Sequence, residues 1–313
     1  MNLADFGVNT DELESQLGSP SVSVVKGRVA HIDADFMAYI VAADTRDELD
    51  GKKPMRNLTH KFGQIKGFGS YLARIVGAES YVLHVTPHGS TKGNRSQQAI
   101  QLEYQGNRSG REQPEHLIPL RAFMIDECGA VAHMDQEADD GLVQAILADP
   151  SNTVLVSDDK DLLMSPGLHY VPNSKEWHDI PFNDFGKLWV DASKSAKKVI
   201  GTGPVFFFQQ LLMGDKADNI QGLPVTQGVK KPVRVGQMKA MEMLNSVDNV
   251  LDAFTLCKHA FQQATDECGW EFKHWKTGEA VTPTQAMLGD MQTLWMRRNK
   301  DPRDVLAFIK ENM

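Results

Sequence analysis

The sequence predicts an α/β fold in which helices cover both faces of a parallel sheet, followed by a helical C-terminal region. Short apolar runs alternate with segments of helical period from about residue 28 onward, which is the pattern of a parallel sheet with crossover helices. After about Ser193 the strand pattern fades and helical patterns continue. The 313 residues, 41% of them hydrophobic, are enough to bury a sizeable core.

The first half of the chain supplies the predicted sheet and the helices around it. An apolar run from Arg28 ends at Asp33, and Leu58–Val76 has apolar residues close to helical period. The predicted strands are residues 28–33, Tyr81–Val85, Ala130–His133, Thr153–Ser157 and Leu168–Val171. The predicted helices of this half are Phe36–Ala43, Leu58–Val76, Pro114–Cys128, Glu137–Ala148 and Asp159–Met164.

The composition along the chain divides it into three parts. Residues 1–27 are polar and rich in serine and form an appendage, residues 28–200 form the core, and residues 201–313 form the helical region. Within the core, Thr86–Arg111 is polar and basic and is an excursion from the fold. The predicted C-terminal helices are Val205–Met213, Gly236–Leu244, Val247–Ala264 and Pro283–Arg298.

Charge and cysteine content exclude several classes of protein. The N-terminus lacks a basic stretch followed by an apolar one, and no apolar run is long enough to span a bilayer, so we expect no membrane partner. Three scattered cysteines argue against a disulfide scaffold and favour the cytoplasm. The net charge of −8 hides two basic stretches, Lys92–Arg111 and Lys216–Lys239, that suit nucleic acid.

Four acidic clusters stand where the predicted fold would bring them together. Asp33 ends the first strand and Asp159 follows the strand Thr153–Ser157, and ligands of open parallel sheets bind beyond the carboxyl ends of the strands. A third cluster opens the helix from Glu137, and a fourth follows the helix that ends at Met213. The candidate metal ligands are Asp33, Glu137, Asp139, Asp140, Asp159, Asp161, Asp215 and Asp218.

These carboxylates predict a cation site because they would repel one another unless cations neutralise them. Oxygen-only ligands suit Mg²⁺, with Mn²⁺ able to substitute, and two such ions about 4 Å apart serve phosphodiester hydrolysis. Each cluster taken singly is also explained by helix-end or turn chemistry. The combination favours the metal, whereas Asp35 and Asp158 are assigned to those structural roles.

The acidic motifs also resemble a known family. Glu137-Ala-Asp-Asp-Gly, Ser157-Asp-Asp-Lys-Asp-Leu and Gly214-Asp-Lys-Ala-Asp-Asn-Ile-Gln-Gly-Leu-Pro are similar in order and spacing to the motifs of flap endonucleases. Ile32-Asp-Ala-Asp-Phe-Met-Ala-Tyr matches the first metal motif and Leu102-Glu-Tyr-Gln-Gly-Asn-Arg the arch motif. The chain looks most like bacteriophage 5′-exonucleases, and is similar to the 5′-nuclease domain of bacterial DNA polymerase I, over about residues 29–244.

The resemblance implies a fold and a role for each matching residue. The fold would be a PIN-like (Rossmann-like) sheet with a helical arch at about residues 87–112 and a helix–three-turn–helix that grips duplex DNA. Asp33, Glu137, Asp139 and Asp159 would hold the first metal ion with Asp140 near it, and Asp161, Asp215 and Asp218 would surround the second. Arg95 and Arg108 would contact phosphates near the scissile bond as catalytic residues, and Tyr104 would stack on a base. The other expected DNA contacts are Lys92, Gln105, Arg111, Lys230, Lys231, Arg234, Gly236 and Lys239.

Two positions depart from the family pattern. Gln105 stands where the arch motif has a lysine that reaches the scissile phosphate, and an amide donates hydrogen bonds but carries no charge. The compact Gly-x-Gly-x-Gly turn is absent, and residues 225–235 insert a basic stretch in its place. The insertion adds positive charge to the expected DNA grip and leaves open whether the family's K⁺ binds there.

The predicted function is that of a metal-dependent 5′→3′ exonuclease and structure-specific flap endonuclease of phage DNA replication. Its partners would be DNA with 5′ single strands, flaps or nicks, RNA primers on DNA, and replication proteins. We expect a monomer in the cytoplasm, which is the host's if a phage encodes the protein. The alternatives are a PIN-like ribonuclease with the same sheet and acids, and a non-catalytic protein that binds DNA junctions.

Overall fold

The computed structural model describes residues 22–43, 58–191, 198–224 and 234–312. Most of the predicted appendage, and Lys230 and Lys231 of the basic insertion, lie outside the described residues. The described chain divides into two compact units. Unit 1 comprises residues 1–93, 112–162 and 167–179, and unit 2 comprises residues 94–111, 163–166 and 180–313.

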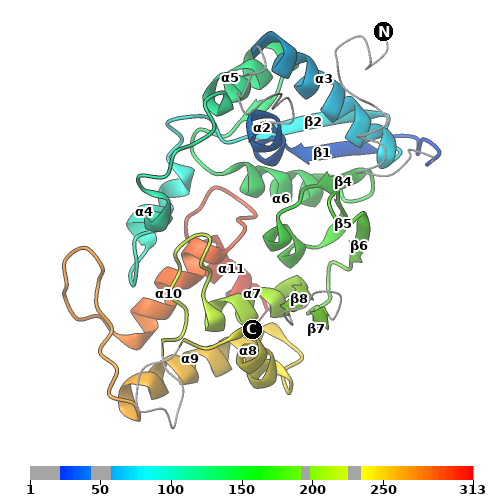
Figure 1. Ribbon diagram of the computed structural model, residues 1–313. Coiled ribbons are helices and arrows are strands. Elements are labelled where there is room, and N and C mark those ends of the chain that lie inside the picture. Colours follow the sequence, from blue (N-terminus) through cyan, green and yellow to red (C-terminus); the bar gives the residue numbers. More distant parts are fainter. Residues whose placement is uncertain (1–21, 44–57, 192–197, 225–233, 313) are drawn as a thin grey trace. The chain divides into compact units, whose positions relative to one another are not determined.

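A six-stranded sheet forms the centre of unit 1, as the sequence predicts (Figure 1). The strand order is β3-β2-β1-β4-β5-β6, and the pairs β3–β2, β2–β1, β1–β4 and β4–β5 are all parallel. The strands are β1 (Val29–Asp33), β2 (Ser80–Val85), β3 (Val131–Ala132), β4 (Thr153–Val156), β5 (Gly167–Val171) and β6 (Glu176–Ile180).

Helices cover both faces of this sheet, which confirms the predicted fold class (Figure 1). Helices α2 (Ala34–Ala43), α3 (Leu58–Ile75) and α5 (Leu117–Cys128) lie on one face, and α6 (Ala138–Ala148) lies on the other. Ile32 of β1, Leu72 of α3 and Leu120 of α5 are fully buried in one hydrophobic core between these layers. The core therefore fixes the carboxyl ends of β1 and β4 in a rigid setting.

Unit 2 is mainly helical and has a second hydrophobic core. It contains Phe206, Phe207 and Phe208 of α7, together with Phe261 and Trp295. Ala99 and Tyr104 of the predicted arch are also part of this core, although the sequence indicates little core material there. The elements are α4 (Arg95–Gln98), β7 (Lys187–Asp191), β8 (Lys198–Thr202), α7 (Gly203–Met213), α8 (Gln237–Leu244), α9 (Val250–Asp266), α10 (Pro283–Leu294) and α11 (Asp304–Glu311).

Several elements differ from the sequence-based expectation. Strands β6, β7 and β8 and helix α11 are not predicted, and β7 pairs with β8 in a separate antiparallel sheet. The last predicted helix ends at Leu294 rather than at Arg298, because Trp295 is extended with φ −68° and ψ 129°. Helix α9 begins after Asn249, whose side chain accepts a hydrogen bond from the backbone of Asp252 at 2.9 Å.

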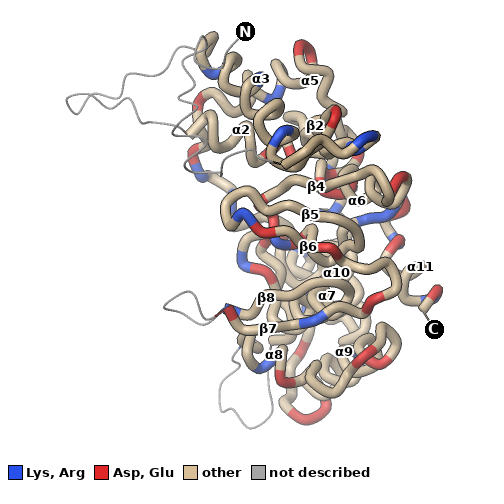
Figure 2. The backbone as a smooth tube through the Cα atoms, turned by 90° about the vertical axis from the view of Figure 1, so that its right-hand side faces the viewer, with Lys and Arg blue, Asp and Glu red and all other residues tan. Residues whose placement is uncertain are grey.

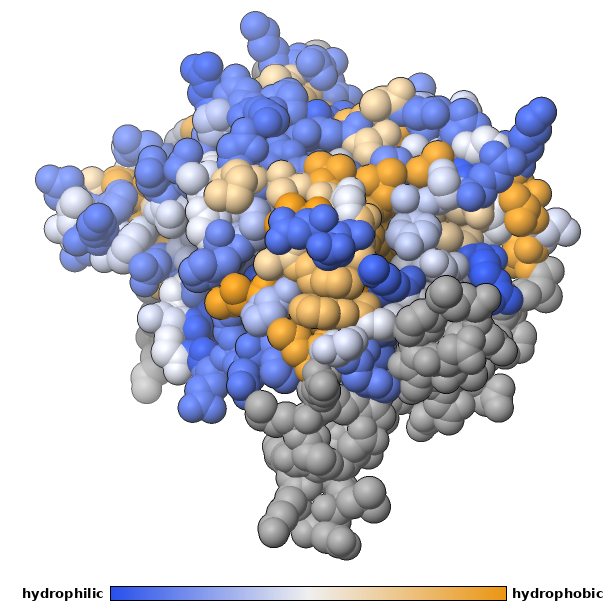
Figure 3. Space-filling view, turned by 90° about the horizontal axis from the view of Figure 1, so that it is seen from above, coloured by the Kyte–Doolittle hydropathy of each residue, from blue (hydrophilic) through white to orange (hydrophobic). Residues whose placement is uncertain are grey.

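Basic and acidic residues are both distributed along the whole described chain (Figure 2). Seen from above, hydrophobic side chains gather among hydrophilic ones on one face (Figure 3). Exposed apolar residues of the helical layer in unit 1 include Tyr39 and Ile40 of α2 and Ile118 of α5. Single exposed apolar side chains are common on protein surfaces. Within the described part of the chain, no helix has the length and apolar character needed to cross a membrane.

Candidate active site

Asp33 is held at the carboxyl end of β1 by three hydrogen bonds. Its Oδ1 accepts from the backbone of Asp35 at 2.9 Å and more weakly from that of Phe36, and its Oδ2 accepts from Ser157 Oγ at 2.8 Å. Only 5% of the residue is exposed. Burial, and then the charge of Asp35, raise the pKa of Asp33 to about 7, so its ionised form is unfavourable without a cation.

Asp159 and Asp161 follow the carboxyl end of the neighbouring strand β4. Ser157 Oγ accepts from the backbone of Asp159 at 3.0 Å, so one hydroxyl orients both strand ends. Asp159 Oδ1 accepts from the backbone of Asp161, whose own carboxylate pairs with Lys160 at 2.5 Å. The surrounding protein, and then Asp161, raise the pKa of Asp159 to about 8, although the residue also has exposed surface. Asp33 is thus the clearer case of a destabilised carboxylate.

The first turn of α6 contributes the third cluster of unit 1. Glu137 and Asp140 form a reciprocal capping box, and Asp140 is fully buried in it. Lys92 Nζ lies 3.9 Å from Glu137 Oε1. Burial raises the pKa of Asp139 well above its usual value, and the next causes are the charges of Asp33 and Asp159. The structure therefore brings the acids of β1, β4 and α6 into one another's electrostatic field.

The chemistry of this set fits a hard divalent cation. All its donors are carboxylate oxygens, and the mutual repulsion at Asp33, Asp139 and Asp159 is the kind that a bound cation would relieve. In the described ranges, however, no three acidic, histidine or cysteine side chains converge as a formed metal site. Asp35 pairs with Arg121 at 3.0 Å, and Asp158 accepts a hydrogen bond from the backbone of Asn173 at 2.8 Å, so both carboxylates have protein partners.

The remaining two acids, Asp215 and Asp218, lie in unit 2 just after α7. The loop is closed by paired backbone hydrogen bonds between Asp215 and Ile220 of 3.1 and 2.7 Å. Asp215 Oδ1 accepts from the backbone of Ala217 at 2.6 Å. This loop is distinct from the three clusters of unit 1 because it belongs to the other compact unit.

Three side chains of the arch motif bind the carboxylate of Asp218. Gln105 Nε2 donates to its Oδ1 at 2.9 Å, Arg108 Nη2 to the same oxygen at 2.8 Å, and Tyr104 Oη to its Oδ2 at 3.3 Å. The backbone of Gln105 also donates to the carbonyl of Asp218 at 2.8 Å. We call these four residues the Asp218 clasp. Gln105 thus contacts an expected metal ligand, and Tyr104 is buried rather than free to stack on a base.

The two expected catalytic arginines have different surroundings. Arg95 is 1% exposed and its Nη2 donates to the carbonyl of Trp295 at 2.9 Å, so it stabilises unit 2 and is not placed to contact a phosphate. Arg108 is half exposed and keeps a guanidinium at the surface beside Asp218. Arg111 is exposed. A charged residue in a polar, basic stretch predicts an exposed side chain. The burial of Arg95 is not predicted because its partner Trp295 is distant in the sequence.

The described part of the predicted duplex grip lies around the start of α8. Arg234 donates to the carbonyl of Ile220 at 3.2 Å and to Gln221 Oε1 at 3.0 Å. Gly236 is the N-cap of α8, and Lys239 is exposed and pairs with Glu242 at 3.0 Å. Phosphate contacts by these residues stay predictions, as do those of Lys230 and Lys231 outside the described residues.

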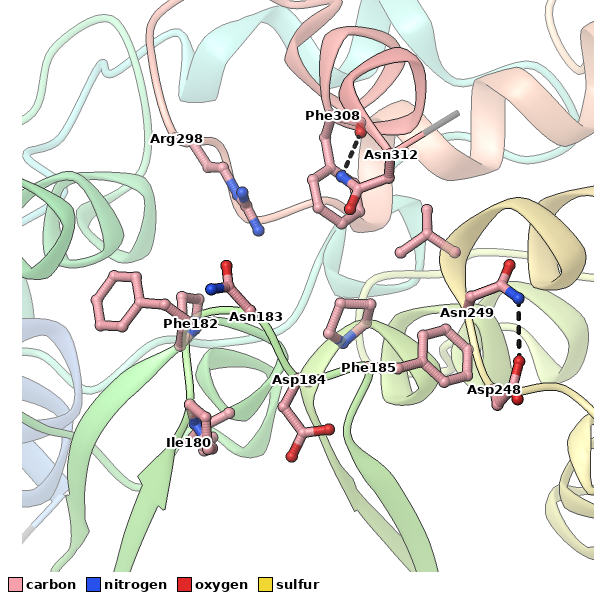
Figure 4. Close-up of a pocket in the computed structure, with 15 residues that line it drawn as sticks. Ile180, Phe182, Asn183, Asp184, Phe185, Asp248, Asn249, Arg298, Phe308 and Asn312 are labelled. Atoms are coloured by element: carbon pink, nitrogen blue, oxygen red, sulfur yellow. Dashed lines mark hydrogen bonds between the residues drawn. The ribbon is translucent and has the colours of Figure 1, made fainter.

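A pocket of about 310 Å³ lies within unit 2, at the start of α7 (Figure 4). Arg298 points into it, its guanidinium 4.3 Å from the centre of the Phe308 ring. Asp184 and Asp248 also line the pocket and carry charge opposite to that of Arg298. This mixture of charges is not that of a phosphate site, and none of the residues that line the pocket is a predicted site residue.

The sequence does not predict a row of three histidines in unit 1, formed by the half-buried His31 and the buried His84 and His133. The hydrogen bonds between these residues cross from strand to strand, so no local spacing reveals them.

No protein-family model matches the sequence, and no curated protein matches it. Among solved structures, the chain is similar to the catalytic core of Rad2 in complex with a DNA substrate. The sequence identity is 12% and the TM-score is 0.38, over 80% of this chain and 70% of that one. A likeness this distant assigns no activity, which must be argued from the residues themselves.

Proposed function

We propose that the protein is a divalent-cation-dependent nuclease that hydrolyses phosphodiester bonds of DNA. The observation that carries the proposal is the set of mutually repelling carboxylates at the carboxyl ends of β1 and β4 and at the start of α6. Such a set is unfavourable by itself and becomes favourable when a cation binds. Together with the flap-endonuclease motifs, it favours phosphodiester hydrolysis over a binding role.

Each residue of the cluster has a defined part in this proposal. Asp33, Glu137, Asp139 and Asp159 would hold a first Mg²⁺, with Asp140 near it in the capping box of α6, and Asp161, Asp215 and Asp218 are the candidates for a second. A bound ion of this kind supplies a water of lowered pKa and neutralises charge on the phosphate. Ser157 keeps Asp33 and Asp159 oriented through its two hydrogen bonds. Arg108 offers a half-exposed guanidinium to phosphate oxygens.

The finer function is a 5′→3′ exonuclease and flap endonuclease acting in phage DNA replication, also on RNA primers paired to DNA. Lys92, Arg111, Lys230, Lys231, Arg234 and Lys239 would bind the nucleic-acid backbone, with K⁺ as a candidate ion near Gly236. A PIN-like ribonuclease is the second candidate, because six of the eight acids lie in unit 1 and would suffice for it.

The deciding experiment is a digestion panel with and without Mg²⁺. Duplex, 5′-flap and RNA–DNA hybrid substrates, labelled at the 5′ or 3′ end, are compared with single-stranded RNA, using Asp139→Asn as the inactive control. We expect Mg²⁺-dependent cleavage near 5′ ends and junctions. Cleavage in EDTA would refute the metal, a preference for single-stranded RNA would favour the ribonuclease, and junction binding without cleavage would favour a non-catalytic protein.

A further inference from the structure

Three imidazole rings form a hydrogen-bonded row across neighbouring strands of unit 1. His31 Nδ1 lies 2.9 Å from His84 Nε2, and His84 Nδ1 lies 3.0 Å from His133 Nε2. The row continues from His133 Nδ1 to Gln136 Nε2 at 3.1 Å. Gln136 and Gln144 then form a reciprocal amide pair, with distances of 3.2 and 3.0 Å. Five side chains from three strand regions and a helix are thus linked end to end.

The row runs toward the acids of α6. His31 lies in the middle of β1, His84 is in register with Asp33 at the end of β1, and His133 directly follows β3. Gln136 immediately precedes Glu137, the N-cap of α6. Gly141 of α6 makes room for the His133 ring, because a Cβ there would lie 2.1 Å from His133 Cε1. Helix α6 therefore packs against the row as well as against the sheet.

The orientation of the Gln136 amide, whose Nε2 faces His133, gives the row a single direction. His84 and His133 are 5% and 7% exposed, and burial lowers the pKa of His84 to about 3, so its ring is neutral. A neutral imidazole has one donor and one acceptor nitrogen. Because the Gln136 amide donates to His133 Nδ1, the proton of His133 is on Nε2, which donates to His84 Nδ1. His84 in turn carries its proton on Nε2 and donates to His31 Nδ1, which leaves the proton of His31 on Nε2. All three rings are then Nε2–H tautomers.

The turn that leads into α6, residues 133–138, is also held by hydrogen bonds of its backbone. Ser90 Oγ donates to the carbonyl of Gln136 at 3.0 Å, and the backbone of Ala138 donates to Thr86 Oγ1 at 2.9 Å. These bonds fix the position of the helix start, whereas the Gln136 amide joins the turn to the histidine row and to Gln144 in the second turn of α6.

We propose that His31, His84, His133 and Gln136 are a positioning chain, whose one direction sets how the first turn of α6 presents Glu137 and Asp139, and thereby the affinity of the carboxylate cluster for a divalent cation. The cation part rests on the proposed function. The chain residues touch no substrate, and act only through α6. Outer groups that orient metal ligands commonly change metal affinity about 10–100-fold when they are removed.

The first test reads the tautomers directly. In the ¹⁵N-labelled protein at pH 8, long-range ¹H–¹⁵N spectra should show only the Nε2–H form for the three rings. Gln136→Met removes the donor without adding charge, so each ring should then show a mixture of both tautomers, even at His31 two strands away. The exposed His88 and His259 serve as internal controls. Unchanged tautomers in Gln136→Met, or mixed tautomers in the wild type, would overturn the chain.

The second test measures Mn²⁺ binding by calorimetry. We expect Gln136→Met to bind at least about tenfold more weakly than the wild type, and the control Gln64→Met, on α3, to bind equally well. If Gln136→Met does not fold, Gln144→Met releases the same amide and should give the same two results. Equal affinity of the variant and the wild type refutes the positioning chain alone. A wild type that binds no Mn²⁺ refutes the proposed function and this inference with it.

Discussion

Unit 1 and unit 2 each place aspartates at or next to the end of a helix or strand, but they surround the carboxylates in opposite ways. In unit 1, burial and neighbouring carboxylates raise the pKa values of both Asp33 and Asp139: Asp35 acts on Asp33, and Asp33 and Asp159 act on Asp139. In unit 2, Asp218 accepts hydrogen bonds from Gln105, Arg108 and Tyr104. Acidic motifs that look alike in the sequence therefore differ in their need for a cation.

Removing one acid of unit 1 should have the largest effect on cleavage. Asp159→Asn should lower single-turnover cleavage of a labelled flap substrate by about a thousandfold or more, because a metal ligand is lost. DNA binding, measured by fluorescence anisotropy, should change little. The matched control is Asp158→Asn, since Asp158 only caps a turn and accepts from Asn173. An Asp159→Asn enzyme of wild-type speed would mean that the cluster is structural.

Substitutions in the Asp218 clasp test the role of the hydrogen-bonded acid in unit 2. Arg108→Ala should slow cleavage about a hundredfold, the scale of losing one charged donor to the transition state. Gln105→Lys should change the rate little, because a lysine can still donate to Asp218 while Arg108 supplies the charge. Both variants are measured at saturating enzyme on one flap substrate. A large gain from Gln105→Lys with no loss from Arg108→Ala would contradict the role given to Arg108.

Substitutions in the basic stretch before α8 test DNA binding separately from catalysis. Replacing Lys230, Lys231 and Arg234 together by Ala should reduce the salt dependence of duplex binding by up to about three units of slope, one for each lost phosphate contact. Affinity is measured at several KCl concentrations. Lys258→Ala, on α9, serves as the control, because it removes an exposed positive charge outside the predicted duplex grip. An unchanged slope would show that the stretch points away from DNA.

The smallest expected effect is a change of melting temperature with pH. Asp33, with a pKa raised to about 7, holds a proton that the unfolded chain has released, so the metal-free protein loses stability as the pH rises from 6.5 to 8. Asp159 acts in the same direction but contributes less than its pKa of about 8 suggests, because its side chain is exposed and solvent screens it. Below pH 6.5 the buried neutral His84 opposes this trend, because only the unfolded chain gains its proton there. We expect a melting temperature about 2–5 °C lower at pH 8 than at pH 6.5 without metal.

Adding Mg²⁺ should remove most of that difference, because the ion binds the ionised cluster of the folded state alone. Asp33→Asn should flatten the decline, since it removes one of the titrating groups. The measurement is a series of thermal melts in EDTA and in Mg²⁺. A metal-free protein as stable at pH 8 as at pH 6.5 would show that neither burial nor neighbouring charge raises the pKa values of these carboxylates.

The sequence predicts the sheet and the strand-end acids because these depend on local pattern. Apolar runs mark β1, β2 and β4, and strand ends in a parallel sheet meet at one edge whatever the loops do. Strand β6 escapes because it is an edge strand with four of its five residues not buried, so it lacks an apolar run. The burial of Arg95 and the hydrogen bonds of Gln105 are not predicted for another reason: both depend on partners more than a hundred residues away.

The contact between His133 and Gly141 has a consequence for recognising relatives. Any side chain at position 141 would collide with the His133 ring, and a smaller residue at position 133 would leave a hole beneath α6. The two positions must therefore change together, as a matched pair eight residues apart that brackets the acidic motif. A search pattern built on this pair, with glutamine between them at position 136, would separate chains that contain the histidine row from nucleases that have only the acids.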